Sequence, residues 1–511
     1  MSDTTAKKVY DYDAERVRDR LVDVFRKRRG EATTADLIAL TGLPKVQVET
    51  EVKAVSDEYG ARLRVTESGE ILYSFPSGMR SRYRGLGPSL RRGWKAFKKG
   101  AAAVASFLFK IWIVVMLVGY FLLFVALALL AMLASVAVSV SGGSKDRDDR
   151  RSGGGLGGLW LTTNIIDTII RVWFYSELFR DPADRAYARE RRRQKRPLYK
   201  AIFSFVFGDG DPDSGWDELE KKAVVAFLQA NKGVVTLPEF MAITGLPPLE
   251  AEARINRYLY EFEGSPEVSE GGTIYYSFPS LLRSRDKVDR TFGFSIPTKR
   301  IAAFSANPKK ANVWFCALNG ANFLFGSYFL ASALSPHSLL SVLYSGQYAG
   351  KIMMVRGWEG FYYFTHQLFG KLAGVADPSL FLGLVLGAVP LAFSILFFAI
   401  PAIRSRRLAA RNERARFENL RRVAYRAVLD GPQSVRPEAI PVADDAARPR
   451  DSRAAERVVT ELAAWAGADP SADGSYAFTE IARGKAEAAK VRAAVDSSAY
   501  DLGRAVFDSH A

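Results

Sequence analysis

Residues 21–85 of this chain recur, without insertion or deletion, as residues 224–288. Long apolar segments separate the two copies. A gap-free duplication predicts one soluble fold made twice and built into a membrane protein. The positions that define the repeat are Thr41, Gly42, Leu43, Pro44, Tyr73, Phe75 and Pro76 in the first copy, and Thr244, Gly245, Leu246, Pro247, Tyr276, Phe278 and Pro279 in the second.

Each copy has the sequence signals of three helices followed by a hairpin. In the first copy, capping threonines, helix-ending glycines and helix-opening Pro44 predict helices over 14–27, 33–42 and 44–59, with strands over 62–66 and 70–75. The second copy repeats this plan, beginning with a helix over 217–230. The order resembles a winged helix-turn-helix. We expect the repeated aromatic residues to close the core of each module, with proline ending the strand.

The tail, residues 403–511, has a similar order of signals with irregular spacing. Helical patterns over 417–429 and 453–466 precede Tyr476 and Phe478. One interpretation is a degenerate third module, and the other is a helical tail with a single aromatic strand.

Four apolar segments are candidates to cross a membrane. Residues 101–141 predict one long helix, although a hairpin that breaks near Gly119 is an alternative. Residues 156–179 either span the bilayer or lie in its interface. Two further spans are predicted over 312–334 and 379–402. The α-helical polytopic class follows, with two or three winged helix-turn-helix-like α+β modules attached.

The segment between the last two spans, 335–378, is rich in aromatic residues and predicts an external, partly interfacial loop. In the last span, Gly383 and Gly387 would let another helix approach closely. That helix belongs either to this chain or to a second copy, so a homo-oligomer is one expectation.

The net charge of +16 is concentrated beside the apolar segments. The basic strips 78–100, 180–200, 283–300 and 404–422 together hold more positive charge than the whole chain, so the remainder is acidic overall. This pattern is typical of cytoplasmic juxtamembrane anchoring to lipids. The residues expected at lipid headgroups are Arg80, Arg82, Arg91, Arg92, Lys95, Arg191, Arg192 and Arg193.

DNA binding is the first function that a winged helix suggests, and it requires a basic third helix. Residues 44–59 contain two lysines against four carboxylates, and 247–262 contain two arginines against three. This charge balance favours contact with a protein partner over DNA.

A calcium loop is a weaker candidate. Carboxylates stand at the ligand spacing of such a loop, but Ser214 occupies the position that requires glycine. The alternative is a turn that caps the helix beginning at Asp217. The candidate calcium ligands are Asp209, Asp211, Asp213, Asp217 and Glu220.

Enzymatic chemistry has little support. The three histidines are His337, His366 and His510, and none has a Ser, Cys or Asp partner at a recognisable spacing. Phosphate-binding loops, dinucleotide-binding glycine motifs and zinc-hydrolase motifs do not occur in the sequence. We therefore expect a non-enzymatic protein without a cofactor.

The motif Phe-Ser-Phe-Val-Phe-Gly-Asp-Gly-Asp-Pro at 203–212, the turn at 231–235 and the Tyr-Ser-Phe-Pro strand within 274–279 resemble a family of uncharacterised membrane proteins of bacteria and chloroplasts. The resemblance is best over 195–290. Plant relatives sometimes carry an iron–sulfur-biosynthesis label, which this chain does not fit, because Cys316 is its only cysteine. The resemblance supports the domain order and implies no established activity.

The sequence thus predicts a multi-pass protein of the bacterial inner membrane with cytoplasmic modules that bind a protein partner or each other. A membrane-tethered DNA-binding regulator and a calcium-responsive regulator are the alternatives. The expected segments are a module at 1–85, a basic strip at 86–100, a span at 101–141, a Ser/Gly-rich loop at 142–155, a spanning or interfacial helix at 156–179, a basic strip and acidic loop at 180–216, a module at 217–288, a basic linker at 289–311, a span at 312–334, a loop at 335–378, a span at 379–402 and the tail at 403–511.

Overall fold

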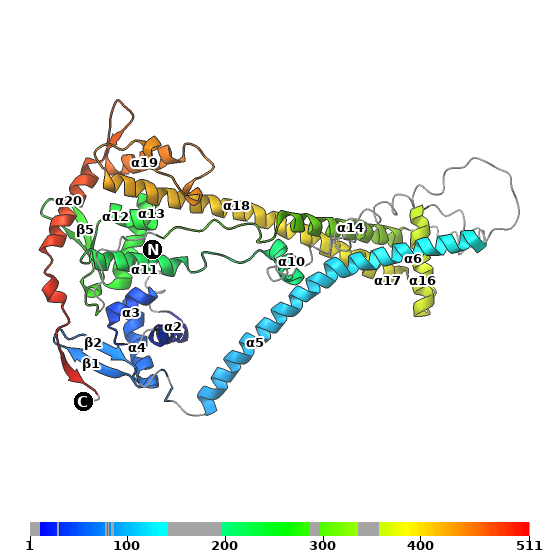
Figure 1. The fold of residues 1–511 in the computed structure, drawn as a ribbon, viewed down its shortest axis with the longest axis horizontal. Helices are drawn as coiled ribbons and strands as arrows, with labels where there is room; N and C mark the ends of the chain where they lie inside the picture. Colours follow the sequence, from blue (N-terminus) through cyan, green and yellow to red (C-terminus); the bar gives the residue numbers. More distant parts are fainter. Residues whose placement is uncertain are drawn as a thin grey trace, which may run out of the picture. The chain divides into compact units, whose positions relative to one another are not determined.

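The computed structural model describes residues 11–27, 30–76, 79, 81–82, 86–141, 196–285, 297–335 and 357–509. These residues are mostly helical and form only short sheets (Figure 1). They divide into two compact units. Unit 1 comprises Met1–Trp94, Asp211–Ala302 and Leu408–Ala511, and unit 2 comprises Lys95–Gly210 and Ala303–Arg407.

The first segment of unit 1 folds as three helices and a hairpin. Its elements are α2 (Ala14–Lys27), α3 (Thr34–Thr41), α4 (Lys45–Tyr59), β1 (Arg62–Thr66) and β2 (Ile71–Ser74). Thr33 and Asp36 form a reciprocal capping box that starts α3, because each side chain accepts a hydrogen bond from the other residue's backbone N–H. Gly42 ends α3 in the left-handed conformation, with φ of 68°.

The second segment of unit 1 has the same order of helices and hairpin. Its elements are α11 (Trp216–Ala230), β3 (Val234–Val235), α12 (Leu237–Thr244), α13 (Pro248–Phe262), β4 (Ser265–Val268) and β5 (Ile274–Ser277). The first residues of α12, α13, β4 and β5 each follow those of α3, α4, β1 and β2 by 203 positions. Thr236 and Glu239 form the capping box of α12, and Gly245 ends that helix with φ of 68°.

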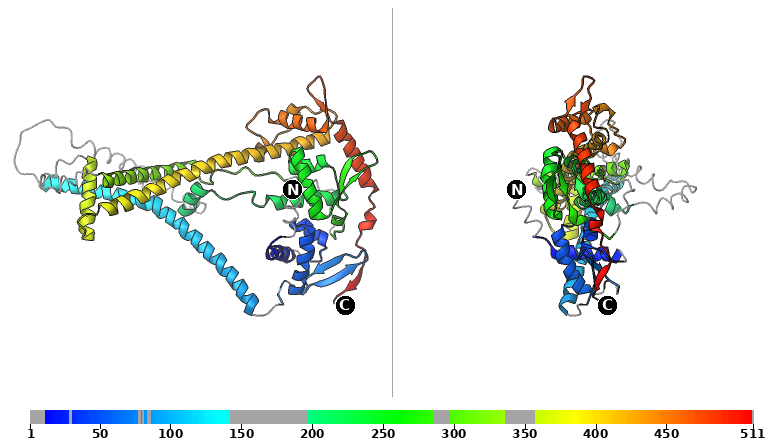
Figure 2. Two further views of the ribbon diagram at one scale, coloured as in Figure 1. Left: turned by 180° about the vertical axis from the view of Figure 1, so that it is seen from behind. Right: turned by 90° about the vertical axis from the view of Figure 1, so that its left-hand side faces the viewer.

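The third segment of unit 1 begins with the end of α18 (Val389–Asp430). A bridge between Val435 and Tyr476 follows, together with α19 (Ala454–Ala466) and the short antiparallel pair β6 (Asp469–Pro470) and β7 (Tyr476–Ala477). Next, α20 (Thr479–Ala494) leads to β8 (Ala505–Asp508), which joins the first hairpin in the order β2-β1-β8 (Figure 2).

One apolar core runs through all three segments of unit 1. Each segment contributes a buried helix face and a buried aromatic residue close to its hairpin. These aromatics include Tyr73, Phe278 and Phe478, of which the last two are 1% exposed. A shared core means that the three segments stabilise one another.

Unit 2 contains the long apolar helices. α5 (Leu86–Val114), the π-helical turn η1 (Val115–Gly119) and α6 (Tyr120–Ser141) are continuous, as are α17 (Ser379–Phe381), the π-helical turn η5 (Leu382–Ala388) and the start of α18. The remaining long helix is α14 (Lys309–Leu334). Among the described residues, three helices have the length and apolar composition to cross a membrane: Gly100–Ala134, Lys309–Leu334 and Ser379–Asp430.

The π-helical turns of unit 2 are stabilised by polar side chains from neighbouring helices. A π-turn interrupts the regular backbone hydrogen bonding of a helix. Asn322 donates to the carbonyl oxygen of Leu117 in η1 at 2.8 Å, and the Tyr120 hydroxyl donates to the carbonyl oxygen of Val385 in η5 at 3.0 Å. These bonds join helices that are far apart in the sequence.

Gly383 and Gly387 pack against α14 of the same chain. A Cβ on Gly387 would lie 2.7 Å from the backbone nitrogen of Leu330, and one on Gly383 would lie 2.6 Å from the Cβ of Ala333. Glycine is needed here because the two helix backbones approach closely. These two residues therefore serve packing within the chain.

The expected loop at 335–378 needs correction, because α16 (Gly357–Ala373) is helical. Phe361 and Tyr362 contact Phe329 of α14, with ring centroids 5.6 Å and 6.1 Å apart. Phe361 and Tyr362 of the expected loop thus lie on the packed face of a helix. The hairpin alternative near Gly119 is also wrong, since η1 continues into α6. The segment expected over 156–179 lies outside the described residues.

Candidate functional site at the helix-docking turns

The two Thr-Gly-Leu-Pro turns of unit 1 are sites where a helix from a later segment packs. A Cβ on Gly42 would lie 3.2 Å from both the carbonyl oxygen of Glu218 and the Cβ of Lys221, which belong to α11. At Gly245, an added Cβ would collide with the carbonyl oxygen of Glu418 in α18. Each glycine therefore supplies a left-handed helix end and also the space for a neighbouring helix.

Arg422 joins α18 to the carboxyl end of α12. Its guanidinium donates to the carbonyl oxygens of Ile243 at 3.1 Å and Thr244 at 2.5 Å, and to the side-chain oxygen of Asn419 at 2.9 Å. The side chain is 2% exposed, and its charge lies at the negative end of the α12 dipole. Burial lowers the pKa of Arg422, but an arginine remains protonated in proteins.

Trp216, the first residue of α11, lies beneath this arginine. The Arg422 guanidinium lies 4.8 Å from the centre of its ring, and the Trp216 indole N–H donates to Glu220 at 3.1 Å. Glu220 in turn accepts from Arg254 of α13 at 2.9 Å. The docking contact thus continues into a network of buried charges in the second segment.

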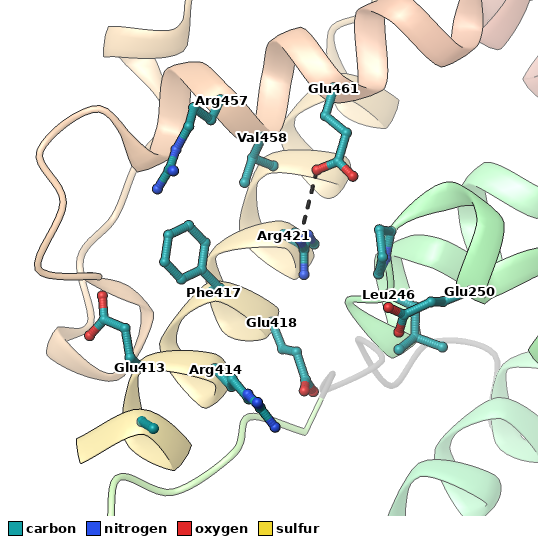
Figure 3. A pocket seen from close by; sticks show the side chains of 12 residues that line it. Leu246, Glu250, Glu413, Arg414, Phe417, Glu418, Arg421, Arg457, Val458 and Glu461 are labelled. Carbon is teal, nitrogen blue, oxygen red and sulfur yellow. Dashed lines mark ion pairs between the residues drawn. The ribbon is translucent and has the colours of Figure 1, made fainter. Parts of the chain in front are cut away.

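A pocket of about 870 Å³ lies beside the second docking turn (Figure 3). Arg421 faces Glu461 across it, with their charged atoms 3.7 Å apart, and the Arg457 guanidinium lies 5.3 Å from the ring centre of Phe417. The lining residues are Leu246, Pro247 and Glu250 from the α12–α13 region, Ala410, Glu413, Arg414, Phe417, Glu418 and Arg421 from α18, and Arg457, Val458 and Glu461 from α19.

The pocket offers four carboxylates, three guanidinium groups and an apolar patch, without a Ser, Thr, Cys, His or Lys side chain in its lining. Such a surface combines charges of both signs with apolar side chains. It is suited to a polypeptide segment that carries both charges and apolar groups. Glu250 and Arg414 are exposed at this surface.

Each of the five candidate calcium ligands pairs with a cationic side chain in the structure. Asp209 accepts from the Ser204 hydroxyl at 2.7 Å, from Arg196 at 2.5 Å and from the backbone N–H of Ala306 at 2.8 Å. Burial raises the pKa of Asp209, but the hydrogen bonds from Ser204 and Arg196 outweigh this effect and hold the pKa below its ordinary value.

The other carboxylates of the expected loop also contact cationic side chains. Asp211 and Asp213 pair with Arg411, Asp217 lies 3.6 Å from the amino group of Lys221, and Glu220 binds Arg254 as described above. Across the described residues, no group of three or more His, Cys, Asp and Glu residues is arranged to hold a metal ion. Calcium binding therefore stays a prediction without a preformed site.

The repeated sequence motifs lie at the docking turns and in the core. The hydroxyls of Thr41 and Thr244 donate to the carbonyl oxygens of Leu37 and Phe240, one turn earlier in their helices. Leu43, Pro44, Leu246 and Pro247 follow the docking glycines and lead into the third helices.

The aromatic part of the motif closes each hairpin onto the helices. Tyr73 exchanges backbone hydrogen bonds with Ala32, and Tyr276 pairs with Val235. Phe75 packs on Phe25 at 4.6 Å between ring centroids. Two prolines follow these aromatics: Pro76 lies in the turn after β2, and Pro279 begins a short 3₁₀ turn after β5.

The residues expected at lipid headgroups are only partly described. Arg82 is exposed, and its backbone N–H donates to the carbonyl oxygen of Glu58. Arg91, Arg92 and Lys95 lie in α5. Arg80, Arg191, Arg192 and Arg193 lie outside the described residues.

Sequence reasoning missed the docking role of Arg422, which was counted in the basic strip 404–422. The signal lay in two asparagines of the same helix, seven residues apart. Asn412 exchanges hydrogen bonds with the backbone of Ala302, and Asn419 exchanges them with that of Lys299, so both hold an extended segment along α18. Neutral amides within a strip of charges indicate a helix face that contacts backbone.

The chain is a distant relative of a plant chloroplast protein. It is 27% identical over 273 residues to a protein of Arabidopsis thaliana described as an uncharacterised chloroplastic protein. The match covers 52% of this chain and 49% of the relative, so the chain spans about half the length of that protein. No protein-family model matches the chain, and no solved structure matches it. The comparison agrees with the expected likeness to uncharacterised chloroplast proteins.

Proposed function

We propose that this protein is a non-enzymatic membrane-anchored scaffold that presents winged-helix modules to protein partners. The observation that carries the proposal is that three of the four cations on α4 and α13, the helices that a winged helix would place in a DNA groove, pair with carboxylates. Lys45 pairs with Glu263 at 2.6 Å, Arg254 with Glu220 at 2.9 Å and Arg257 with Glu261 at 2.7 Å. Phosphate would have to compete with these carboxylates.

The shared order of elements supports the winged-helix interpretation. Three helices precede a hairpin in the first two segments, with bounds that differ by a constant 203 positions over most elements. The third segment has a corresponding long helix and hairpin, and its Val435–Tyr476 bridge resembles the Ala32–Tyr73 and Val235–Tyr276 pairs. We infer three modules, each of the first two receiving the next at its docking turn.

A scaffold needs a rigid frame and an exposed surface. The docking turns supply the frame, because Gly42 and Gly245 are in contact with α11 and α18. The surface that remains for a partner includes the mixed-charge pocket beside α18. Its mixed charge suits a protein segment better than an acidic polymer such as DNA.

We further propose that the chain resides in the bacterial inner membrane with all three modules on the cytoplasmic side. The basic strips that flank the three long apolar helices support this arrangement, which also requires the expected helix over 156–179 to cross the membrane. The test uses a Cys316→Ser background with a single cysteine at Glu250 or at Lys371, labelled with a membrane-impermeant maleimide on intact spheroplasts. Labelling of Lys371→Cys alone is expected. Labelling of Glu250→Cys before lysis would contradict the orientation.

The scaffold is tested by site-specific photocrosslinking in living cells. A photoreactive residue at Arg414, inside the pocket, is expected to give a discrete crosslinked protein, whereas one at Arg426, exposed on the same helix outside the pocket lining, serves as the matched control. Identical crosslinking patterns at both positions would count against a partner site in the pocket.

The DNA-binding alternative is separated by retention on duplex DNA across a range of salt concentrations. The scaffold predicts no retention at low salt by the detergent-solubilised chain. Steep salt-dependent retention that is lost in a Lys45→Glu and Arg254→Glu double variant would instead establish a membrane-tethered regulator.

A further inference from the structure

The C-terminal strand β8 occupies the outer edge of the first hairpin. It pairs antiparallel with β1, with Arg64 opposite Asp508 and Val65 opposite Phe507. The N–H of Ser509 donates to the carbonyl oxygen of Leu63 at 2.9 Å, and the N–H of Leu63 donates to the Ser509 hydroxyl at 3.0 Å. The edge of β1 therefore accepts an extended polypeptide as an added strand.

The corresponding edges of the other two hairpins carry proline. Leu63 lies opposite Tyr73, whereas Pro266 lies opposite Tyr276 and Pro470 lies opposite Tyr476. Proline has no N–H to donate to an added strand, and proline on an edge strand is a common block against pairing. Among these three hairpins, only the first has a backbone N–H at this edge position, that of Leu63.

The side chains beside this edge select a negative charge. Arg62 donates to both carboxylate oxygens of Asp508, at 2.9 Å and 3.0 Å from its Nε, and Arg64 lies 3.7 Å from the same carboxylate. An acidic residue in the added strand is thus held by two guanidinium groups.

β8 buries little apolar surface in this position. Val506 remains 65% exposed and Phe507 remains 58% exposed. Backbone hydrogen bonds and the ion pairs with Asp508 therefore supply most of its attachment, and a strand held in this way exchanges readily because exposed ion pairs contribute little net stability.

We propose that the outer edge of β1 is the binding site for an extended segment of a partner protein that carries an acidic residue, and that β8 is the chain's own competitor for this site. This inference rests on the proposed scaffold function and names the class of partner segment. The partner segment would take the place of β8 beside β1. It would form the backbone hydrogen bonds with β1 that β8 forms now.

The test measures fluorescence anisotropy of a labelled peptide of residues 501–511 with the chain in detergent. A variant that ends at Val495 lacks β8 but keeps α20. We expect this variant to bind the peptide, and we expect the full chain to bind it at least about tenfold more weakly, because the tethered strand competes at a high effective concentration. Equal binding by the two chains would show that β8 does not compete, and absence of binding by the shortened chain would overturn the proposal.

Two further variants of the shortened chain separate edge pairing from adventitious binding. Leu63→Pro removes the edge donor and is expected to abolish peptide binding, while Leu63→Val is the matched control and should retain it. Proline at the corresponding position of the other hairpins shows that the module accommodates it. Binding unchanged by Leu63→Pro would exclude strand addition.

The charge requirement is tested in both directions. In the shortened chain, Arg62→Glu should lower the affinity for the peptide at least about tenfold, and a peptide with Asp508→Arg should restore affinity for that variant.

These outcomes do not depend on finding a cellular partner. Failure of the photocrosslinking experiment would therefore reject the scaffold, whereas failure of peptide binding would reject only the strand site.

Discussion

The guanidinium of Arg422 donates a hydrogen bond of 2.5 Å to the carbonyl oxygen of Thr244, the last residue of α12. A second bond to Ile243 makes one buried side chain responsible for two carbonyl groups at a helix end. The last carbonyl groups of a helix have no partner within it, so their burial requires a donor from elsewhere. Arg422 supplies this donor from a segment far away in the sequence.

Replacement of Arg422 by leucine is expected to destabilise unit 1 by about 2–4 kcal/mol, because it leaves buried carbonyl groups without donors and removes the contact with Trp216. The measurement is the denaturant midpoint followed by tryptophan fluorescence. Arg426→Leu, at an exposed position of the same helix, is the control and should leave the midpoint nearly unchanged. Equal effects of the two substitutions would contradict the docking role.

Alanine at the docking glycines should separate conformational strain from steric collision. Gly42, Gly69 and Gly245 all have positive φ, so alanine at any of them costs about 1–2 kcal/mol in backbone strain. No atom lies within 4 Å of a Cβ at Gly69, whereas one at Gly245 meets the Glu418 carbonyl oxygen. The expected order of destabilisation is Gly245→Ala, then Gly42→Ala, then Gly69→Ala. If the denaturant midpoint of Gly245→Ala is no lower than that of Gly69→Ala, α18 can move away from the added Cβ without loss of stability.

Local signals predicted the elements of the modules well. Thr33, Gly42 and Pro44 each act at the position where the sequence indicated the start or end of a helix, because capping depends on neighbours along the chain. The long apolar helices were equally predictable from the sequence, since length and composition define them.

The contacts between segments were not predictable in this way. Arg422 has the same charge as its exposed neighbour Arg426, and charge alone does not distinguish a buried arginine from an exposed one. The pairing of β8 with β1 joins residues 446 positions apart, as in the Arg62–Asp508 contact. Such pairing depends on which edge remains open after the rest of the unit has folded.

Asp473 in the turn between β6 and β7 should make this hairpin sensitive to acid. Hydrogen bonds from the Ser475 hydroxyl and from Arg436 lower its pKa from 3.8 to about 2. A carboxylate whose folded pKa is depressed stabilises the fold above its unfolded value, and that contribution is lost as the pH falls from 3.8 towards about 2. The measurement compares the thermal midpoints of the chain and its Asp473→Asn variant. Their difference should be present above pH 3.8 and vanish below about pH 2, and a difference that persists at lower pH would assign the effect to packing.

Removal of the Asn322 amide should weaken the packing of the apolar helices. Asn322 is fully buried, and it donates to Leu117 in the π-helical turn η1. Leucine has a similar size but no donor, so Asn322→Leu leaves that carbonyl group without its side-chain partner at an expected cost of about 1–2 kcal/mol. The measurement is the thermal midpoint in detergent, with Leu324→Met at an exposed position of α14 as the control. A higher thermal midpoint for Asn322→Leu than for the unmodified chain would show that desolvation of the buried amide destabilises the protein by more than its hydrogen bond stabilises it.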